Sequence, residues 1–155
     1  MRRGFLLAVA LLLLTLAGVG PATAGPNGSG HHGTMCVLNT RLLAANETTG
    51  SNSAASGHAQ IKVRNDGTIE WKVFVLNPAG ETFIAGHVHR APAGVAGPIV
   101  LPLHMSGNTT AMQIRDTGEA SNPTLGAAIC ANPSGYYVNY HTTTFQGGAI
   151  RGQLG

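Results

Sequence analysis

Three histidines are spaced so that they could hold a metal ion together. His87 and His89 stand two positions apart in a segment that is typical of a β-strand, and residues i and i+2 of a strand point to the same face. His141 lies in a second strand-like segment near the C-terminus. Imidazoles on two neighbouring strands form a three-nitrogen site that suits copper or zinc. The pattern predicts a copper or zinc site at His87, His89 and His141.

A structural role for the same histidines is an open alternative. Strand alternation places Tyr137, Asn139 and His141 on one face. Buried polar side chains are normally hydrogen-bonded, so these residues could form a polar cluster that needs no metal. The remaining histidines fall in the tail, in a loop or at a strand end, and they receive no role: His31, His32, His58 and His104.

Motifs for catalysis are scarce. His87-Val-His89 on a strand of a small β protein looks like the copper-side motif of copper/zinc superoxide dismutases, but no second metal site or aspartate ligand accompanies it. The sequence has no nucleophile elbow, no His-Glu-x-x-His and no phosphate loop. Its carboxylates, Asp116 included, are assigned mostly to turns and outward strand positions. We expect a non-enzymatic protein, with a copper enzyme handling superoxide as the alternative.

One ion pair is predicted between the two ends of the domain. Glu47 follows the first strand and Arg151 lies in the last one. In a chain with so few charges, these two side chains are expected to meet as a bidentate pair that locks the ends together. The alternative is that both are solvated.

The pattern of apolar residues predicts an all-β fold. In the clearest unit, Ile61 and Val63 alternate with charged residues, a turn follows at residues 65–67, and alternation resumes around Trp71. This hairpin should bury one face, with Trp71 in the core. A short helix near 122–131 begins with an Asn-Pro pair. We predict an antiparallel, Greek-key-like sandwich or barrel of about eight strands, at 34–44, 58–64, 68–76, 82–89, 98–104, 110–115, 135–141 and 148–154.

The N-terminus reads as an export signal. Arg2 and Arg3 precede an apolar run over residues 5–19, and Ala22-Thr23-Ala24 is a small-residue cleavage pattern. The run is shorter than the roughly 20 residues of a membrane span. We expect a signal peptide at 1–24, a flexible tail at 25–33 and one β domain at 34–155, without a membrane span after cleavage. The protein should be secreted or periplasmic.

The two cysteines fit that compartment. An even cysteine count in an exported chain favours a disulfide between Cys36 and Cys130, with a free buried pair as the alternative. Loss of Arg2 and Arg3 leaves seven basic residues against six acidic ones. With no basic run, this balance excludes nucleic acid as the expected partner. The partner would be an unknown extracellular protein or surface ligand.

Several segments together resemble the CHRD domain, named for chordin. The likeness implies an all-β, immunoglobulin-like or barrel-like domain over most of the mature chain, and it assigns no activity. Arg90 stands where glycine is common, Thr48-Thr49-Gly50 replaces a hydrophobic and proline-containing stretch, and the cysteine pair is foreign to the pattern. The matching segments are Leu43-Ala-Ala-Asn-Glu47, Gly86-His-Val-His89, Gly97-Pro-Ile-Val-Leu-Pro-Leu103, Tyr137-Val-Asn-Tyr-His141-Thr142 and Gly147-Gly-Ala-Ile-Arg-Gly-Gln-Leu154.

Overall fold

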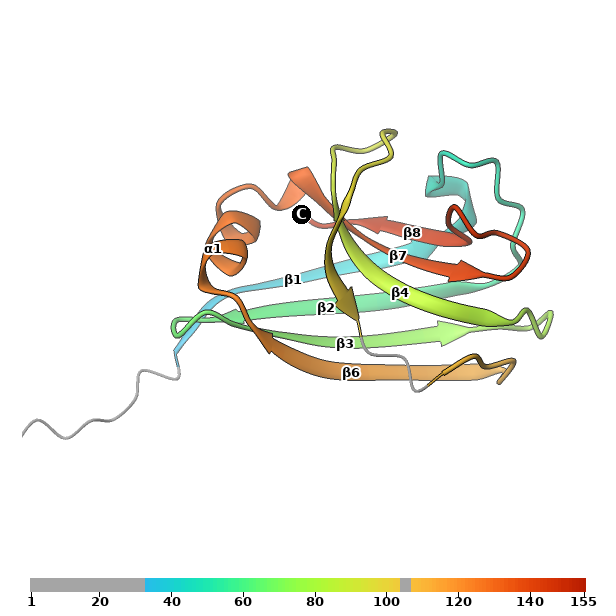
Figure 1. The fold of residues 1–155 in the computed structure, drawn as a ribbon, viewed down its shortest axis with the longest axis horizontal. Helices are drawn as coiled ribbons and strands as arrows, with labels where there is room; N and C mark the ends of the chain where they lie inside the picture. Colours follow the sequence, from blue (N-terminus) through green and yellow to red (C-terminus); the bar gives the residue numbers. More distant parts are fainter. Residues whose placement is uncertain (1–32, 104–106) are drawn as a thin grey trace, which may run out of the picture.

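The computed structural model describes residues 33–103 and 107–155. The predicted signal peptide at 1–24 lies outside the described residues, as do the predicted tail up to residue 32 and His104. In the described part, eight antiparallel strands and one short helix form a nearly closed, barrel-like sheet (Figure 1). The all-β prediction is confirmed.

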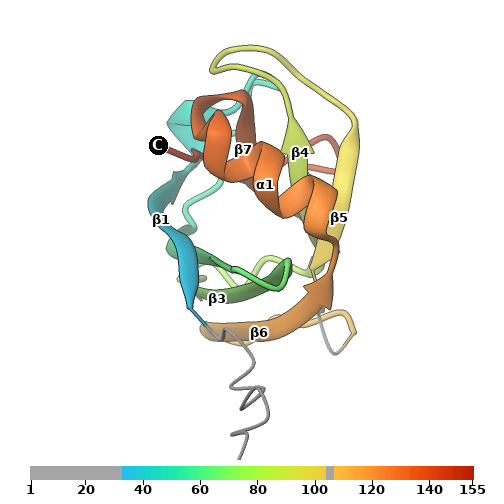
Figure 2. The same ribbon diagram turned by 90° about the vertical axis from the view of Figure 1, so that its left-hand side faces the viewer.

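The strands follow the order β5-β4-β7-β8-β1-β2-β3-β6 around the barrel. Figure 2 shows the two end strands of this order, β5 and β6, approaching each other, with α1 lying over the opening between the walls. The elements are β1 (Thr34–Leu43), η1 (Ala44–Asn46), β2 (Ser56–Arg64), β3 (Thr68–Leu76), β4 (Phe83–Arg90), β5 (Ile99–Leu103), β6 (Gln113–Ser121), α1 (Pro123–Ala131), η2 (Pro133–Gly135), β7 (Tyr136–Thr142) and β8 (Ile150–Gln153).

The hairpin of β2 and β3 forms as the alternation predicts. Ile61 pairs with Trp71, and Val63 with Ile69, all with side chains buried in the barrel. The turn between the strands ends at Gly67, whose φ of +84° is a left-handed conformation that suits glycine. A Cβ there would also lie 2.5 Å from Pro123 at the start of α1. The turn therefore fixes the hairpin and seats the helix.

The predicted strand at 110–115 is wrong in its bounds, because β6 runs from Gln113 to Ser121. Asp and Gly are common in turns, but Asp116 and Gly118 lie within β6 and contact core residues. Gly118 pairs with Trp71, and a Cβ at Gly118 would lie 2.4 Å from the indole. The glycine thus makes room for the largest side chain of the barrel, which a turn interpretation misses.

Asp116 is buried, not at a turn or outward position as the sequence suggested. Its Oδ1 accepts a hydrogen bond from Trp71 Nε1 at 3.2 Å, and its Oδ2 accepts one from the Tyr140 hydroxyl at 2.7 Å. Burial, with the carboxylate beside it, raises the pKa of Tyr140, so the hydroxyl stays a donor. Two donors from the core therefore satisfy a carboxylate that would otherwise be costly to bury.

Replacing Trp71 with alanine is expected to lower the free energy of unfolding by about 3–5 kcal/mol, because it opens a cavity and removes a donor to Asp116. Urea denaturation followed by circular dichroism measures the loss. Lys72→Ala, next along β3 and exposed, is the control and should change the stability by less than about 0.5 kcal/mol. A cost below about 1 kcal/mol for Trp71→Ala would contradict the assignment of Trp71 to the core.

The predicted helix and disulfide are both present. Asn122 caps α1, its side-chain oxygen accepting from the Leu125 N–H at 3.0 Å, and Pro123 occupies the first turn. Cys36 in β1 is bonded to Cys130 in α1, with the two Cα atoms 5.8 Å apart. The disulfide ties the helix over the barrel opening to the first strand.

Candidate metal centre

The pairing of β4 with β7 brings the three histidines together. His87 lies opposite Asn139, and Ala85 opposite His141, so all three imidazoles share one face. The alternate residues, such as Val88 and Val138, are fully buried in the core. The histidines therefore project from the outer side of the barrel wall.

Loops cover this outer face, so its side chains are largely removed from solvent. His89 and His141 are each 7% exposed, whereas His87 is only partly buried. Every residue of β7 is buried, because the core covers one face of the strand and these loops cover the other. The histidines thus sit in a sheltered site that opens at His87.

The three rings lie close enough to share a small ion. His87 Nδ1 is 3.0 Å from His141 Nε2, and the ring centroids of His89 lie 5.5 Å from His87 and 5.7 Å from His141. One ring nitrogen from each histidine can be chosen so that all three lie within 4.8 Å of one another. In the described part of the chain, this is the one group of three or more His, Cys, Asp or Glu side chains arranged in this way.

Backbone carbonyls fix the tautomers of two rings. His89 Nδ1 is 2.9 Å from the Gly97 carbonyl oxygen, and His141 Nδ1 is 2.9 Å from that of Gln146. A carbonyl oxygen can only accept, so both Nδ1 atoms carry the proton and both Nε2 atoms present a lone pair. Carbonyl-oriented imidazoles of this kind are characteristic of metal ligands. His87 Nδ1 then donates to His141 Nε2.

The Nε2 atom of His89 has no hydrogen-bond partner among the described residues although it is buried. The Tyr137 ring stacks on the same imidazole at 4.9 Å with an interplanar angle of 11°. The Tyr137 hydroxyl accepts the Gly97 N–H at 3.0 Å, which steadies the carbonyl that orients His89. A fixed imidazole thus presents an unused lone pair.

The predicted bidentate pair of Glu47 with Arg151 is wrong. Among the described residues the Arg151 guanidinium donates to the carbonyls of Pro92 and Val95 and to the Gln153 side chain, and it lies 3.4 Å over the Tyr137 ring. Its fork is therefore occupied by the loop above the histidines. The ends of the domain are joined instead by the Asn46 amide, which donates to the Arg151 carbonyl at 3.0 Å.

Glu47 lies near the histidines, and it makes no ion-pair contact with any residue that the structure describes. A Cβ on Gly148 would lie within 2.7 Å of both carboxylate oxygens and 2.6 Å from Asn139 Nδ2. Burial raises the pKa of Glu47 to about 7, although the Arg151 charge opposes the shift. The tightly fitted carboxyl group is therefore partly protonated at neutral pH.

Burial also keeps the histidines neutral. It lowers the pKa of all three imidazoles, and it brings that of His87 to about 4 with help from the charges that His141 and His89 would carry. Neutral imidazole is the form that binds metal. At pH 7 the site is in its ligand form.

The lowered pKa values predict how metal-free protein responds to acid. The His87 pKa is lower in the folded state than the ordinary imidazole value of 6.5, so the contribution of His87 to stability is present above pH 6.5 and is lost as the pH falls towards 4. The pKa of Glu47 is raised in the folded state, so protonation of Glu47 increases the stability of the protein as the pH falls over the same range. The comparison is therefore made with His87→Gln, which keeps Glu47. In urea denaturation with a chelator, the advantage of the parent protein should be larger at pH 7.5 than at pH 4.5, and an advantage independent of pH would contradict the assignment.

Sequence reasoning missed the groups that orient the imidazoles. The carbonyls of Gly97 and Gln146 are backbone groups, which no residue type reveals. Tyr137 and Asn139 were placed on the correct face by alternation, and the structure adds the stack of Tyr137 on His89.

The sequence was compared with models of known protein families. The CHRD domain model matches residues 38–154, nearly all of the β domain. The chain belongs to the CHRD family. The comparisons with curated proteins and with solved structures found no match. In this CHRD domain the matched stretch runs from β1 to just past β8, and it contains all three histidines.

No helix in the part of the chain that the structure describes is long and apolar enough to cross a membrane.

Proposed function

We propose that this CHRD domain is an exported, non-enzymatic binding or structural module that holds one copper or zinc ion on His87, His89 and His141. The observation that carries the proposal is the buried His89 Nε2, which has no partner among the described residues and belongs to a ring fixed by the Gly97 carbonyl. His141 Nε2 presents a second lone pair nearby.

A purely structural cluster accounts for less of this geometry. Such a cluster would satisfy both nitrogens of each buried ring. His141 meets that condition through the Gln146 carbonyl and His87, but the buried His89 does not. A buried polar atom without a partner costs about 1–3 kcal/mol, and a bound metal ion would remove that cost.

Closing the site around an ion requires a small adjustment. Metal–nitrogen bonds of about 2.0–2.1 Å bring ligand nitrogens to about 3 Å from one another, so the 4.8 Å limit must shrink by less than 2 Å. His87 must also break the hydrogen bond from its Nδ1 to His141 Nε2, which frees the His141 lone pair for the ion. The His87 ring is the least buried of the three and has no carbonyl holding its tautomer among the described residues, so it is the one that can rearrange.

Export is supported by two independent features. The first 24 residues have the basic, apolar and small-residue pattern of a signal peptide. The disulfide between Cys36 and Cys130 belongs to oxidising compartments. We therefore place the protein outside the cytoplasm, secreted or periplasmic, where its partner would be an extracellular protein or surface ligand.

Metal analysis of the mature protein tests the proposal. Chelator-treated protein is titrated with Cu(II) and, separately, with Zn(II) at pH 7, and bound metal is measured after gel filtration. One equivalent per chain is expected, and it should persist in the His31→Ala/His32→Ala variant. Protein that retains no metal under either condition would leave the hydrogen-bonded, structural interpretation of the histidines.

A further inference from the structure

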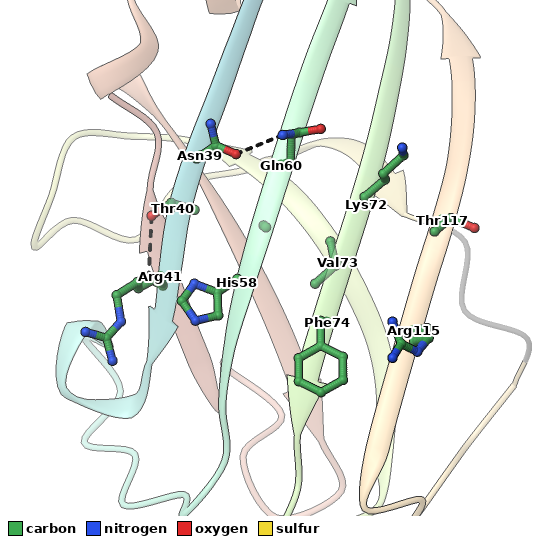
Figure 3. A pocket seen from close by; sticks show the side chains of 11 residues that line it. Asn39, Thr40, Arg41, His58, Gln60, Lys72, Val73, Phe74, Arg115 and Thr117 are labelled. Atoms are coloured by element: carbon green, nitrogen blue, oxygen red, sulfur yellow. Dashed lines mark hydrogen bonds between the residues drawn. The ribbon is translucent and has the colours of Figure 1, made fainter.

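A second feature lies on another part of the barrel wall. The outward-facing side chains of β1, β2, β3 and β6 line a shallow groove of about 470 Å³ (Figure 3). Strand pairing fixes its floor as a row across the four strands, in which Arg41 lies opposite His58, His58 opposite Phe74, and Phe74 opposite Arg115. None of these residues belongs to the histidine cluster on β4 and β7.

The groove is basic. Arg41, Lys72 and Arg115 line it with exposed side chains, and no carboxylate is among its lining residues. The nearest carboxylate along β3, Glu70, is already paired with Lys62 and Arg64. Arg41, Lys72 and Arg115 form no ion pair within the described residues, so three of the seven cations of the predicted mature chain gather on one face with their charge unmatched.

The spacing of the cations suits a linear ligand. Neighbouring strands lie about 4.8 Å apart, so the row from Arg41 on β1 to Arg115 on β6 spans roughly 14 Å. A second row beside it carries Asn39 opposite Gln60, which pairs with Lys72. Gln60 Nε2 donates to Asn39 Oδ1 at 3.0 Å, so the two amides are held in place with a donor and an acceptor left for a ligand.

The row contains two aromatic rings, the His58 imidazole and the Phe74 phenyl group, and a cation already covers Phe74. The Arg115 guanidinium carbon lies 5.2 Å from the centroid of Phe74, which is half-buried. This arrangement is unsuited to stacking successive bases, which requires several free aromatic faces. Among the residues that line the groove, no apolar side chain protrudes for insertion into a lipid surface, because the exposed Val37 and Leu76 lie outside the lining. The groove fits a ligand with spaced anions and many hydroxyl groups.

We infer that this groove binds an acidic polysaccharide that carries carboxylates, such as a polyuronate. The guanidinium groups of Arg41 and Arg115 would take carboxylates in two-pronged hydrogen bonds, with Lys72 as a point charge between them. The amides of Asn39 and Gln60 would bind sugar hydroxyls. This second site would give an exported module a means of attachment to a surface polymer.

Affinity electrophoresis and calorimetry with polygalacturonate test the inference on the mature protein. Binding is expected at low salt, should weaken as NaCl screens the charges, and should be absent with neutral dextran. The triple variant Arg41→Gln/Lys72→Gln/Arg115→Gln should bind about 30-fold more weakly, because three exposed charge contacts are lost. All three side chains point away from the core, and an unchanged circular dichroism spectrum establishes that the variant is folded.

The matched control is Arg90→Gln, which removes one exposed cation from β4, outside the groove. The single groove variant Arg115→Gln should weaken binding, whereas Arg90→Gln should not. If both variants lost the same affinity for polygalacturonate, binding would depend on the net charge of the protein and not on the groove, which would overturn the inference. So would an absence of binding to polygalacturonate, or tighter binding to duplex DNA or to phosphatidylglycerol vesicles than to the polyuronate.

Discussion

Breaking the disulfide is expected to lower the free energy of unfolding by about 4.5 kcal/mol in the chain-entropy model, because the bond closes a long loop of the unfolded chain. Cys36 and Cys130 are 94 positions apart in the sequence. The change is the double variant Cys36→Ser/Cys130→Ser, compared with the oxidised protein by urea denaturation. Fluorescence of Trp71, the only tryptophan, reports the core directly.

The disulfide prediction has a chemical control. Non-reducing mass spectrometry should find the mature protein two hydrogens lighter than its reduced form, and thiol titration of the unfolded, unreduced protein should find no reactive cysteine. Two titratable thiols per chain, or a loss of less than about 1 kcal/mol in the double variant, would contradict the account.

Replacing any one of the three histidines with alanine is expected to reduce the affinity for Cu(II) or Zn(II) by more than about 100-fold, since losing a ligand costs more than losing an outer partner. Competition titration against a coloured chelator measures the affinity of His87→Ala, His89→Ala and His141→Ala. His58→Ala is the matched control, because His58 is exposed on β2 and outside the cluster. Equal affinity in all four variants would show that metal binds elsewhere.

A variant of Tyr137 tests whether the orientation of the His89 imidazole contributes to metal binding. Tyr137→Phe keeps the ring stacked on His89 but removes the acceptor for the Gly97 N–H, whose carbonyl orients that imidazole. A loss of about tenfold in metal affinity is expected, smaller than that of a ligand variant. If His89 were only a packing residue, Tyr137→Phe would change stability alone.

The sequence predicts the fold well where side-chain periodicity is strong. The β2–β3 hairpin follows from strict alternation and a turn sequence that tolerates left-handed backbone. The helix follows from Asn122 and Pro123, whose capping chemistry is local. The family resemblance was confirmed by the match over residues 38–154.

Local patterns fail where tertiary partners decide. Asp116 and Gly118 have turn-forming types, yet Asp116 is buried by hydrogen bonds from Trp71 and Tyr140, and Gly118 makes room for the indole. These partners lie far from Asp116 and Gly118 in the sequence, so local residue patterns do not reveal them. The same reason explains the ion pair predicted for Arg151, whose guanidinium is taken by carbonyls of the loop before β5.

The three histidines of the candidate site could be chosen from the sequence, but their tautomers and pKa values could not. His87 and His89 stand two positions apart in β4, so their side chains point to the same face. If β4 pairs with β7, His141 can lie on that face too. Nothing in the residue types shows that the Gly97 and Gln146 carbonyls fix the tautomers, or that burial lowers the pKa of His87 to about 4. These features come from loops that fold back over the strands, and they are the ones that favour metal binding.

Anomalous X-ray diffraction from crystals of the mature protein loaded with copper or zinc is the most direct measurement of the central claim. We predict one strong peak about 2.0–2.1 Å from a ring nitrogen of each of His87, His89 and His141. The His87–His141 hydrogen bond should be replaced by two metal bonds. A peak at the N-terminal histidines, or no peak with that hydrogen bond retained at 3.0 Å, would contradict the metal site.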